Sequence, residues 1–305
     1  MHKVSIVIPA KNEENCIEQC LGSLFKIDFP REQYEIIVVD NGSTDSTRNI
    51  AESFGVKVIS VPLGAIAAVR NGGAEEAEGN FLAFLDADCT VEKDWLYQAT
   101  RYFSKENIVC FGSAPIIPKS ATWVQQTWFF VREKVDEVTD VSWLESMNMF
   151  VRKDIFFKVG GFNEKLITCE DVDLSYRLAA YGKIVSDKRI VAIHHGEAAS
   201  IKEFFAKERW RGKSNYTGIW QHGLKLGEIP SLVLPLYFIT SMLFGLLLLL
   251  IYARPLPAVI VLLVGQLPLM LLSWIKIKHA FSLNKYARLL ILYNVYFLAR
   301  ACAIF

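Results

Sequence analysis

Two stretches near the end of the sequence carry no charged residue, and they constrain the fold more than any other feature. Residues 231–253 supply 23 uncharged residues, and residues 255–275 supply 21 more. About 20 apolar residues are enough for a helix to cross the hydrocarbon core of a bilayer. We therefore expect two membrane-spanning helices joined by a tight turn at Arg254. The segment 289–305 has 17 residues and a charge at Arg300, and we expect a third span there whose arginine reaches outward to water.

Basic residues indicate how these spans are oriented. They are concentrated before the first span and between the second and third, whereas the turn between the first two spans has only one. Basic loops stay preferentially on the cytoplasmic side of a membrane. We therefore expect a multi-pass protein of a bacterial or archaeal cell membrane, with its N-terminal part in the cytoplasm and its C-terminus outside. The residues concerned are Lys202, Lys207, Arg209, Arg211, Lys213 and Lys225, then Lys276, Lys278, Lys285 and Arg288.

The segment that precedes the first span has a composition of its own. Residues 201–213 interleave basic and acidic side chains with three aromatic ones, a pattern typical of a helix that lies in the plane of a membrane interface. We therefore expect three parts in the chain. They are a cytoplasmic domain at residues 1–200, an amphipathic interfacial segment at 201–230 and a membrane region at 231–305.

Four apolar runs separated by helical patterns predict an α/β fold for the first part. The runs lie at residues 4–8, 34–39, 56–61 and 81–85, and their continuous apolar character is typical of strands buried on both faces. Strands and helices that alternate at this spacing favour right-handed crossovers and a mostly parallel sheet. A further segment, 121–138, carries aromatic residues among charges and favours an amphipathic helix packed against that sheet.

Carboxylates follow three of these strands and predict a binding site. Glu13 and Asp40 follow the first two, while Asp86 and Asp88 directly follow the run at 81–85. An Asp-x-Asp pair alone is more often a solvated turn. Parallel strands, however, end at one edge of a sheet, and four carboxylates there repel one another unless a cation or a donor-rich ligand binds. A sugar nucleotide held through a divalent cation meets this requirement.

Charge and cysteine content set two further expectations. A net charge of +1 gives no reason to expect nucleic-acid binding. The six cysteines form no C-x-x-C pair, so we expect free thiols and no disulfide framework.

Four motifs together resemble those of the family 2 glycosyltransferases, in the same order and at similar spacing. They are VIPAKNEE at 7–14, IVVDNGSTD at 37–45, RNGG at 70–73 and FLDAD at 84–88. The resemblance implies a GT-A fold with nucleotide-binding topology, a nucleotide-diphosphate-sugar donor and a divalent cation, Mn²⁺ or Mg²⁺.

The same resemblance implies roles for individual residues. Asp88 would bind the metal, and Arg70 would face the diphosphate of the donor. Asn148 lies in a stretch similar to the one that lines the donor sugar in this family. The other residues implied in donor binding are Pro9, Ala10, Glu13, Asp40, Asp86 and Ala87.

Glu170 and Asp171 begin a predicted helix and resemble the catalytic-base motif of the family. Acidic residues at a helix N-terminus are about as often only partners of the helix dipole. As a base, Asp171 would deprotonate the acceptor hydroxyl while that hydroxyl attacks the anomeric carbon from the face opposite the diphosphate. We therefore expect inversion of configuration.

Two later motifs leave alternatives open. His194 and His195 follow an apolar strand, where a histidine is either a ligand of Mn²⁺ or a hydrogen-bonded strand end, and the sequence does not say which of them faces the metal. Arg209 and Trp210 resemble part of the Gln-x-x-Arg-Trp motif of processive synthases such as cellulose synthase. The Gln position is occupied by Ala206, so we expect these residues to bind the acceptor and leave processivity open.

The leading hypothesis is an inverting, metal-dependent glycosyltransferase that adds a sugar to a hydroxyl of a lipid or lipid-linked glycan at the membrane, in the synthesis of a cell-envelope polysaccharide or glycolipid. One alternative is a polyprenyl-phosphate glycosyltransferase. A phosphate acceptor is already ionised and needs no general base, so the Glu-Asp motif speaks against it. The other alternative is a non-catalytic, nucleotide-binding scaffold of a polysaccharide assembly complex.

Overall fold

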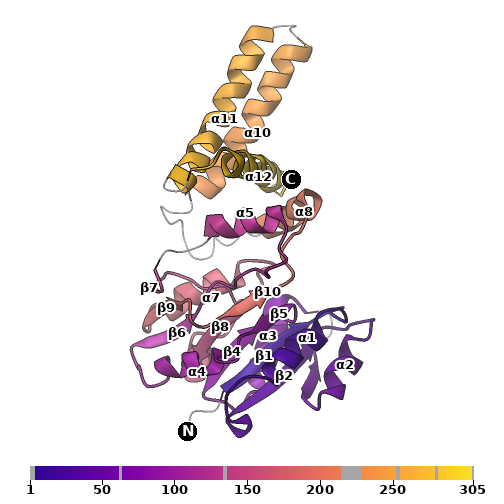
Figure 1. Cartoon of the computed structure of the whole chain (residues 1–305), viewed down its shortest axis with the longest axis vertical. Helices are drawn as coiled ribbons and strands as arrows, with labels where there is room; N and C mark the ends of the chain where they lie inside the picture. Colours follow the sequence, from indigo (N-terminus) through magenta and orange to yellow (C-terminus); the bar gives the residue numbers. More distant parts are fainter. Residues whose placement is uncertain are drawn as a thin grey trace. The chain divides into compact units, whose positions relative to one another are not determined.

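The computed structural model divides into two compact units, which are described separately (Figure 1). The first unit comprises residues 1–118 and 134–196, and the second comprises residues 119–133 and 197–305. The structure describes residues 4–61, 64–132, 136–213, 229–251, 255–278 and 281–303.

The first unit is built on a mixed sheet in the order β3-β2-β1-β4-β8-β6-β9-β7. A two-stranded sheet pairs β10 with β5. The strands are β1 (Val4–Ala10), β2 (Tyr34–Asp40), β3 (Lys57–Ser60), β4 (Phe81–Leu85), β5 (Cys89–Val91), β6 (Ile108–Gly112), β7 (Val138–Asp140), β8 (Asn148–Arg152), β9 (Lys183–Asp187) and β10 (Ala192–His194).

The predicted α/β fold with a mostly parallel sheet is confirmed. β1 pairs in parallel with both β2 and β4, and Ala10 lies opposite Asp40 at the end of the first of these pairs. β8 runs antiparallel between β4 and β6. The carboxyl ends of β1, β2 and β4 therefore meet at one edge of the sheet, as the sequence predicted.

Helices cover both faces of this sheet, which explains the continuous apolar strands. One core lies around Ile6, Ile8 and Leu21, and a second around Val7, Val39 and Phe84. The helices of this unit are α1 (Ile17–Leu24), α2 (Thr47–Ser53), α3 (Ile66–Glu75), α4 (Trp95–Ala99), α6 (Lys153–Lys158) and α7 (Glu170–Leu178), with 3₁₀ turns at Arg31–Gln33 and Thr100–Tyr102.

The second unit is helical and contains a helix that the sequence placed elsewhere. Its helices are α5 (Trp123–Arg132), α8 (Ile201–Gly212), α10 (Ile229–Leu250), α11 (Pro255–Ile277) and α12 (Leu283–Cys302). Trp128 of α5 packs against Phe204 of α8 and against Tyr293 of α12. The amphipathic helix expected in residues 121–138 is α5, and its aromatic side chains belong to the core of the second unit and not to the cores of the sheet, whereas Val138 lies in β7.

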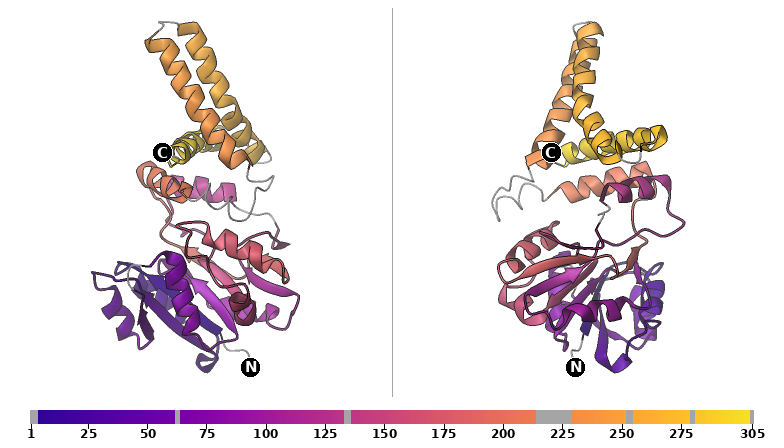
Figure 2. Two further views of the ribbon diagram at one scale, coloured as in Figure 1. Left: turned by 180° about the vertical axis from the view of Figure 1, so that it is seen from behind. Right: turned by 60° about the vertical axis from the view of Figure 1, so that its left-hand side comes forward.

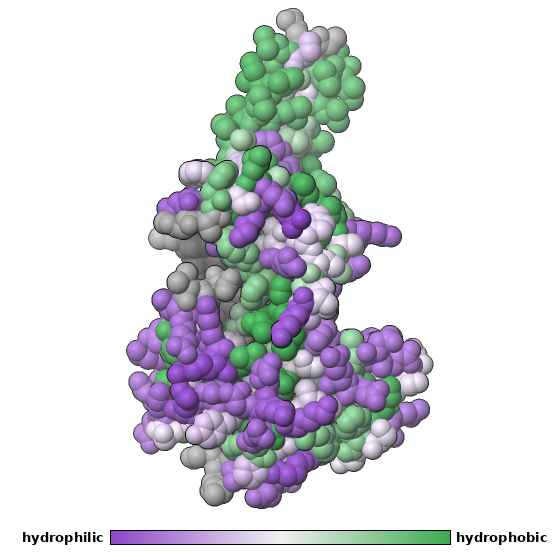
Figure 3. All heavy atoms as spheres, viewed as in Figure 1, coloured by the Kyte–Doolittle hydropathy of each residue, from purple (hydrophilic) through white to green (hydrophobic). Residues whose placement is uncertain are grey.

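α10 and α11 form a hairpin whose surface is strongly apolar (Figures 2 and 3). Both are long and apolar enough to cross a membrane. Leucines such as Leu250 and Leu256 are 71% and 70% exposed, unlike the core helices of a soluble domain. The hairpin therefore indicates association with a membrane. The turn residue Arg254 and most of the expected interfacial segment beyond α8, residues 214–228, lie outside the described residues.

The helix that contains the segment expected to form a third span begins before that segment and is less apolar than α10 and α11. The part of the chain that the structure describes has two helices long and apolar enough to cross a membrane, and α12 is not one of them. α12 begins at Leu283, so it includes Lys285 and Arg288 as well as Arg300. It packs against α5 and α8 and also contacts α10 and α11 (Figure 2). The sequence analysis placed Lys285 and Arg288 in a loop before this segment, because the apolar run begins only at Leu289.

Candidate functional site

The loops after β1 and β2 are held together by hydrogen bonds between their backbones and side chains. Asn12 has a left-handed backbone with φ of 56°, a conformation that asparagine tolerates better than most residues. Its Oδ1 accepts a 2.9 Å hydrogen bond from the backbone N–H of Thr44, and its own N–H donates to Ser43 Oγ at 3.0 Å. The backbone N–H of Glu13 donates to Thr47 Oγ1 at 2.7 Å. The two loops expected to face the nucleoside thus form one rigid piece.

The predicted residues on these strands lie at the shared edge. Ala10 and Asp40 end their strands, and the Asp40 side chain, only 5% exposed, accepts a 3.2 Å hydrogen bond from the backbone N–H of Ser43. Pro9 and Ala87 are buried, so they can offer a ligand backbone atoms at most.

Arg70 joins two parts of the chain that the sequence did not connect. It lies on α3, is 3% exposed and donates from Nη2 to Asp86 Oδ1 and from Nη1 to Glu170 Oε1, each at 2.7 Å. A buried guanidinium with two carboxylates is compensated in charge and fixed in orientation. The strand end after β4 and the start of α7 are therefore locked to each other through one cation.

This pairing leaves Asp171 as the carboxylate of the motif that Arg70 does not hydrogen-bond. Asp171 lies at the start of α7, after Cys169, whose left-handed φ of 66° turns the chain into the helix. Burial and the nearby Glu170 carboxylate raise the pKa of Asp171 to about 7. A base whose pKa lies near the working pH is well suited to accept a proton from a hydroxyl group.

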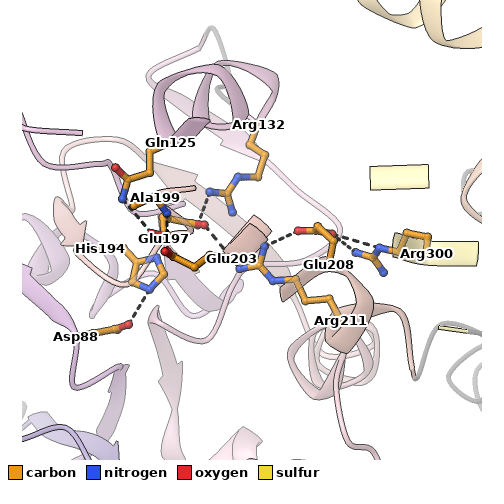
Figure 4. Close-up of polar contacts among 10 residues, drawn as sticks. All are labelled: Asp88, Gln125, Arg132, His194, Glu197, Ala199, Glu203, Glu208, Arg211 and Arg300. Atoms are coloured by element: carbon orange, nitrogen blue, oxygen red, sulfur yellow. Dashed lines mark hydrogen bonds and ion pairs between the residues drawn. The ribbon is translucent and has the colours of Figure 1, made fainter. Parts of the chain in front are cut away.

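Asp88, the second aspartate of the Asp-x-Asp motif, lies close to His194. Asp88 Oδ2 lies 3.0 Å from His194 Nε2 (Figure 4). His195 turns instead to Thr90 Oγ1, 2.9 Å from its Nε2. Of the two histidines, His194 is therefore the one that meets the Asp-x-Asp motif. A Cβ on Gly196 would overlap the Asp88 carboxylate, so this position needs a glycine. In the sequence, the one feature that drew attention to Gly196 is its place directly after the two histidines.

The donor atoms at this point fit a hard divalent cation. One ligand atom each from Asp88, Cys89 and His194 lies within 4.8 Å of the others. Burial, followed by the charges of Asp86 and Asp88, raises the pKa of the Cys89 thiol well above its usual value, and sulfur is in any case a softer ligand than Mn²⁺ or Mg²⁺ prefers. The carboxylate and imidazole that remain suit Mn²⁺ or Mg²⁺.

Asn148 does not fit the predicted contact with the donor sugar. It is 0% exposed, its Oδ1 accepts a 2.9 Å hydrogen bond from Trp95 Nε1, and its Nδ2 donates to Ser113 and to the backbone oxygen of Ile190. Both hydrogens of its NH₂ group and one lone pair of its oxygen are used inside the protein, where they satisfy buried polar groups.

Arg209 and Trp210, expected to bind the acceptor, lie on α8 in the second unit. Both are exposed, and the Trp210 side chain is 48% accessible. Glu208 and Gly212 of the same helix are buried. The Arg-Trp pair therefore lies on the outward side of α8, where it is open to a ligand.

Comparison with characterised proteins supplies relatives of known activity. The chain is 32% identical over 189 residues to "Glycosyltransferase AglE" of Haloferax volcanii, covering 59% of this chain and 62% of that protein. It is 27% identical over 243 residues to a "Beta-monoglucosyldiacylglycerol synthase" of Nostoc sp., covering 73% of this chain and 51% of that protein. The chain thus matches between half and two thirds of the length of these relatives.

Solved structures share the fold at low sequence identity. The mannosyltransferase PcManGT of Pyrobaculum calidifontis, in complex with GDP-Man and Mn²⁺, aligns with a TM-score of 0.63 at 14% identity, over 99% of this chain and 86% of that chain. S. aureus TarS 1-349 in complex with UDP-GlcNAc aligns with a TM-score of 0.52 at 18% identity, over 98% and 90%. The expected GT-A fold is confirmed. Because the model of "Glycosyl transferase family 2" matches residues 5–163, more than half of the sequence, the chain belongs to this family.

Proposed function

We propose that the protein is an inverting, metal-dependent glycosyltransferase that transfers a sugar from a nucleotide-diphosphate sugar to a hydroxyl of a lipid or lipid-linked glycan at the membrane. The observation that carries this proposal is the difference between the two neighbouring carboxylates at the start of α7. Glu170 is ion-paired with Arg70 at 2.7 Å, while Asp171 keeps a carboxylate with a raised pKa. One carboxylate is thus structural and the other is available as a base.

The reaction would be a single displacement. The acceptor oxygen forms a bond to the anomeric carbon as the bond from that carbon to the diphosphate breaks, and the nucleoside diphosphate leaves with the electron pair. Asp171 takes the hydroxyl proton. Attack from the face opposite the leaving group inverts the configuration.

The remaining residues of the edge would bind and orient the donor. The joined loops that carry Glu13 and Asp40 would hold the nucleoside, and Asp88 with His194 would hold the divalent cation. A cation there would neutralise the diphosphate as it leaves. Arg70 would act mainly by keeping Asp86 and Glu170 in place, since both ends of its guanidinium are engaged.

The membrane part supports an acceptor that lives in or on the bilayer. We propose that α10 and α11 cross the membrane with the first unit on the cytoplasmic side, where sugar nucleotides are made. The relative from Nostoc sp. is named a Beta-monoglucosyldiacylglycerol synthase, and this supports a lipid acceptor. Arg209 and Trp210, exposed on α8, would contact the acceptor.

The test is nucleoside-diphosphate release by the detergent-purified protein with Mn²⁺, across a panel of sugar nucleotides, with and without a lipid extract. The product's anomeric configuration is read by NMR. Asp171→Asn is compared with Asp173→Asn on the same helix, where Asp173 pairs with Arg177 at 2.6 Å. Lipid-dependent release lost only in Asp171→Asn supports the proposal, and retention of configuration contradicts it.

The same comparison addresses the phosphate-acceptor alternative. A polyprenyl phosphate carries its nucleophilic charge already, so Asp171→Asn would then lose little activity. The raised pKa of Asp171 supports the hydroxyl acceptor, because a base with a pKa near neutrality can accept the proton that such an acceptor must lose. The scaffold alternative finds no support, since the chain belongs to a family of enzymes.

A further inference from the structure

We propose that α12 lies in the plane of the membrane surface, with one side against lipid, on the same face of the membrane as the start of α10. This inference rests on α10 and α11 crossing the bilayer, and it is independent of the reaction proposed above. Because two crossings return the chain to its starting side, the segment after α11 begins on that side. The question is whether α12 then crosses again.

From Ala287 to its end, one side of α12 is apolar and exposed. Ala287, Ile291, Leu298 and Cys302 are all exposed, with 47% for Ile291 and 39% for Leu298. At about 100° per residue these four positions fall within an arc of about 60° of the helix. A narrow apolar stripe of this kind is costly in water and suits the boundary between headgroups and acyl chains.

The opposite side of α12 is already occupied. Leu289, Tyr293 and Phe297 are buried in the core shared with Trp128 of α5 and Phe204 of α8. α12 is thus fixed on two amphipathic helices along its length, whereas a membrane-spanning helix would have lipid or other spanning helices around its middle.

The charge near the end of α12 has its partner on α8. Arg300 Nη2 donates at 2.8 Å to Glu208 Oε2, and Glu208 Oε1 accepts from Arg211 Nη1 at 2.8 Å (Figure 4). The Glu208 side chain is 1% exposed. Removing one partner from a buried charge is strongly destabilising, so a crossing that pulled Arg300 away from Glu208 is disfavoured.

The two flanks of the exposed stripe differ, and they indicate what covers it. On one flank Asn294 exchanges hydrogen bonds of 2.8 and 3.1 Å with Gln266 of α11, which leads to the apolar hairpin. On the other flank Arg288 lies 5.8 Å from the ring of Trp123 on α5. An amphipathic helix at a membrane surface has lipid tails along one flank and basic residues, which face the headgroups, along the other. On α11 itself, Leu263 and Leu267, close to Gln266 in the sequence, are 60% and 57% exposed, so lipid is the occupant that fits.

The experiment measures the depth of spin labels on the full-length protein in liposomes. Labels are placed by Ala287→Cys, Ile291→Cys and Leu298→Cys and at the native Cys302, with Cys16 and Cys169 replaced by serine. Collisions with oxygen and with a water-soluble nickel chelate report depth. We expect the four depths to agree within about one helical turn, 5 Å, whereas a span would spread them over about 22 Å.

Leu243→Cys and Leu250→Cys on α10 are the matched control. These leucines are 59% and 71% exposed, and labels there should differ in depth by about 10 Å if α10 spans. A graded depth along α12 overturns the proposal in favour of a third span. Equal depths with free access to nickel show a face in water, and equal depths shielded from both relaxants show a second copy or a partner protein; both also overturn it.

A second measurement needs no substitution. Native Cys16, in the first unit, and Cys302 are both at least partly exposed. In sealed vesicles of known orientation, a membrane-impermeant maleimide should reach both from the same face, as read by peptide mass spectrometry. Reaction of Cys302 from the opposite face overturns the proposal, even if the serine variants do not fold.

Discussion

The guanidinium of Arg70 donates a 2.7 Å hydrogen bond to Glu170, a residue one hundred positions later in the chain. Arg70→Gln leaves the buried Glu170 without its cation, and we expect the free energy of unfolding to fall by about 3–5 kcal/mol. Chemical denaturation in detergent measures the loss. The control is Arg48→Gln, because the Arg48–Glu52 pair is exposed and such pairs contribute about 0–1 kcal/mol. Equal losses in the two variants would contradict the structural role of Arg70.

The raised pKa of Asp171 predicts an acid limb in the activity profile. A base acts only when deprotonated, so kcat/KM should fall as the pH drops through about 7. The charge of Arg70 lowers the pKa of Asp171, and Arg70→Gln should therefore move this limb to higher pH. Rates measured between about pH 5 and pH 9 for both proteins check this, provided the variant remains folded. A limb that does not move excludes Asp171 as its source.

His194 and His195 should differ in their effect on the metal. His194→Ala removes the imidazole that lies 3.0 Å from Asp88, and we expect a loss of Mn²⁺ affinity of roughly 10–100-fold or more. His195→Ala, which loses a contact to Thr90, should change it far less. Titration of free Mn²⁺ by electron paramagnetic resonance distinguishes them. Chelation with EDTA should abolish turnover, and added Mn²⁺ should restore it. A larger loss of Mn²⁺ affinity in His195→Ala than in His194→Ala would contradict the assignment of His194 as the metal ligand.

Gly196→Ala should reduce activity without unfolding the protein. The new Cβ would overlap the Asp88 carboxylate, which must turn away from His194. Gly22→Ala on α1 is the matched control, because a Cβ there meets nothing within 4 Å. We expect a rise in the Mn²⁺ concentration needed for half-maximal rate in Gly196→Ala alone. Wild-type metal dependence in this variant would show that Asp88 does not need its observed position.

Asn148→Ala should affect stability and leave donor binding unchanged. Each buried group left without a partner, Trp95 Nε1 among them, costs about 1–3 kcal/mol. Thermal unfolding measures this loss, and the KM for the donor should stay the same in the folded fraction. Asn49→Ala, at an exposed position on α2, should change neither. A raised KM for the donor with normal stability would support the contact between Asn148 and the donor sugar that the sequence predicted.

The sheet and its edge could be predicted because they depend on local signals. The run Phe81–Leu85 is apolar throughout, and this is enough to indicate a strand buried on both faces; Asp86 and Asp88 then follow at its end. The insertion of β8 between β4 and β6 could not be predicted in the same way, because an antiparallel strand in a mixed sheet carries no distinct pattern of its own.

The polar contacts of the site depend on residues far apart in the sequence. Neither Arg70 nor Glu170 indicates its partner by composition, and Asn148 looked like a ligand because an asparagine in a family motif can serve a substrate or a buried network equally well. The same limit applies to α12. Nothing around Arg300 in the sequence indicates that Glu208, ninety-two residues earlier, meets its side chain.

The Arg70 bridge has a consequence for evolution and engineering. Asp86 belongs to the segment expected to bind the donor, and Glu170 begins the segment expected to serve the acceptor, yet one guanidinium holds both. A chimera that combined the first segment of this chain with the second of a relative should lose stability unless the incoming segment brought a carboxylate to the position of Glu170. We therefore expect that changes of acceptor are best engineered in the residues around Glu170. Glu170 itself should be kept, because it pairs with the arginine of the first segment.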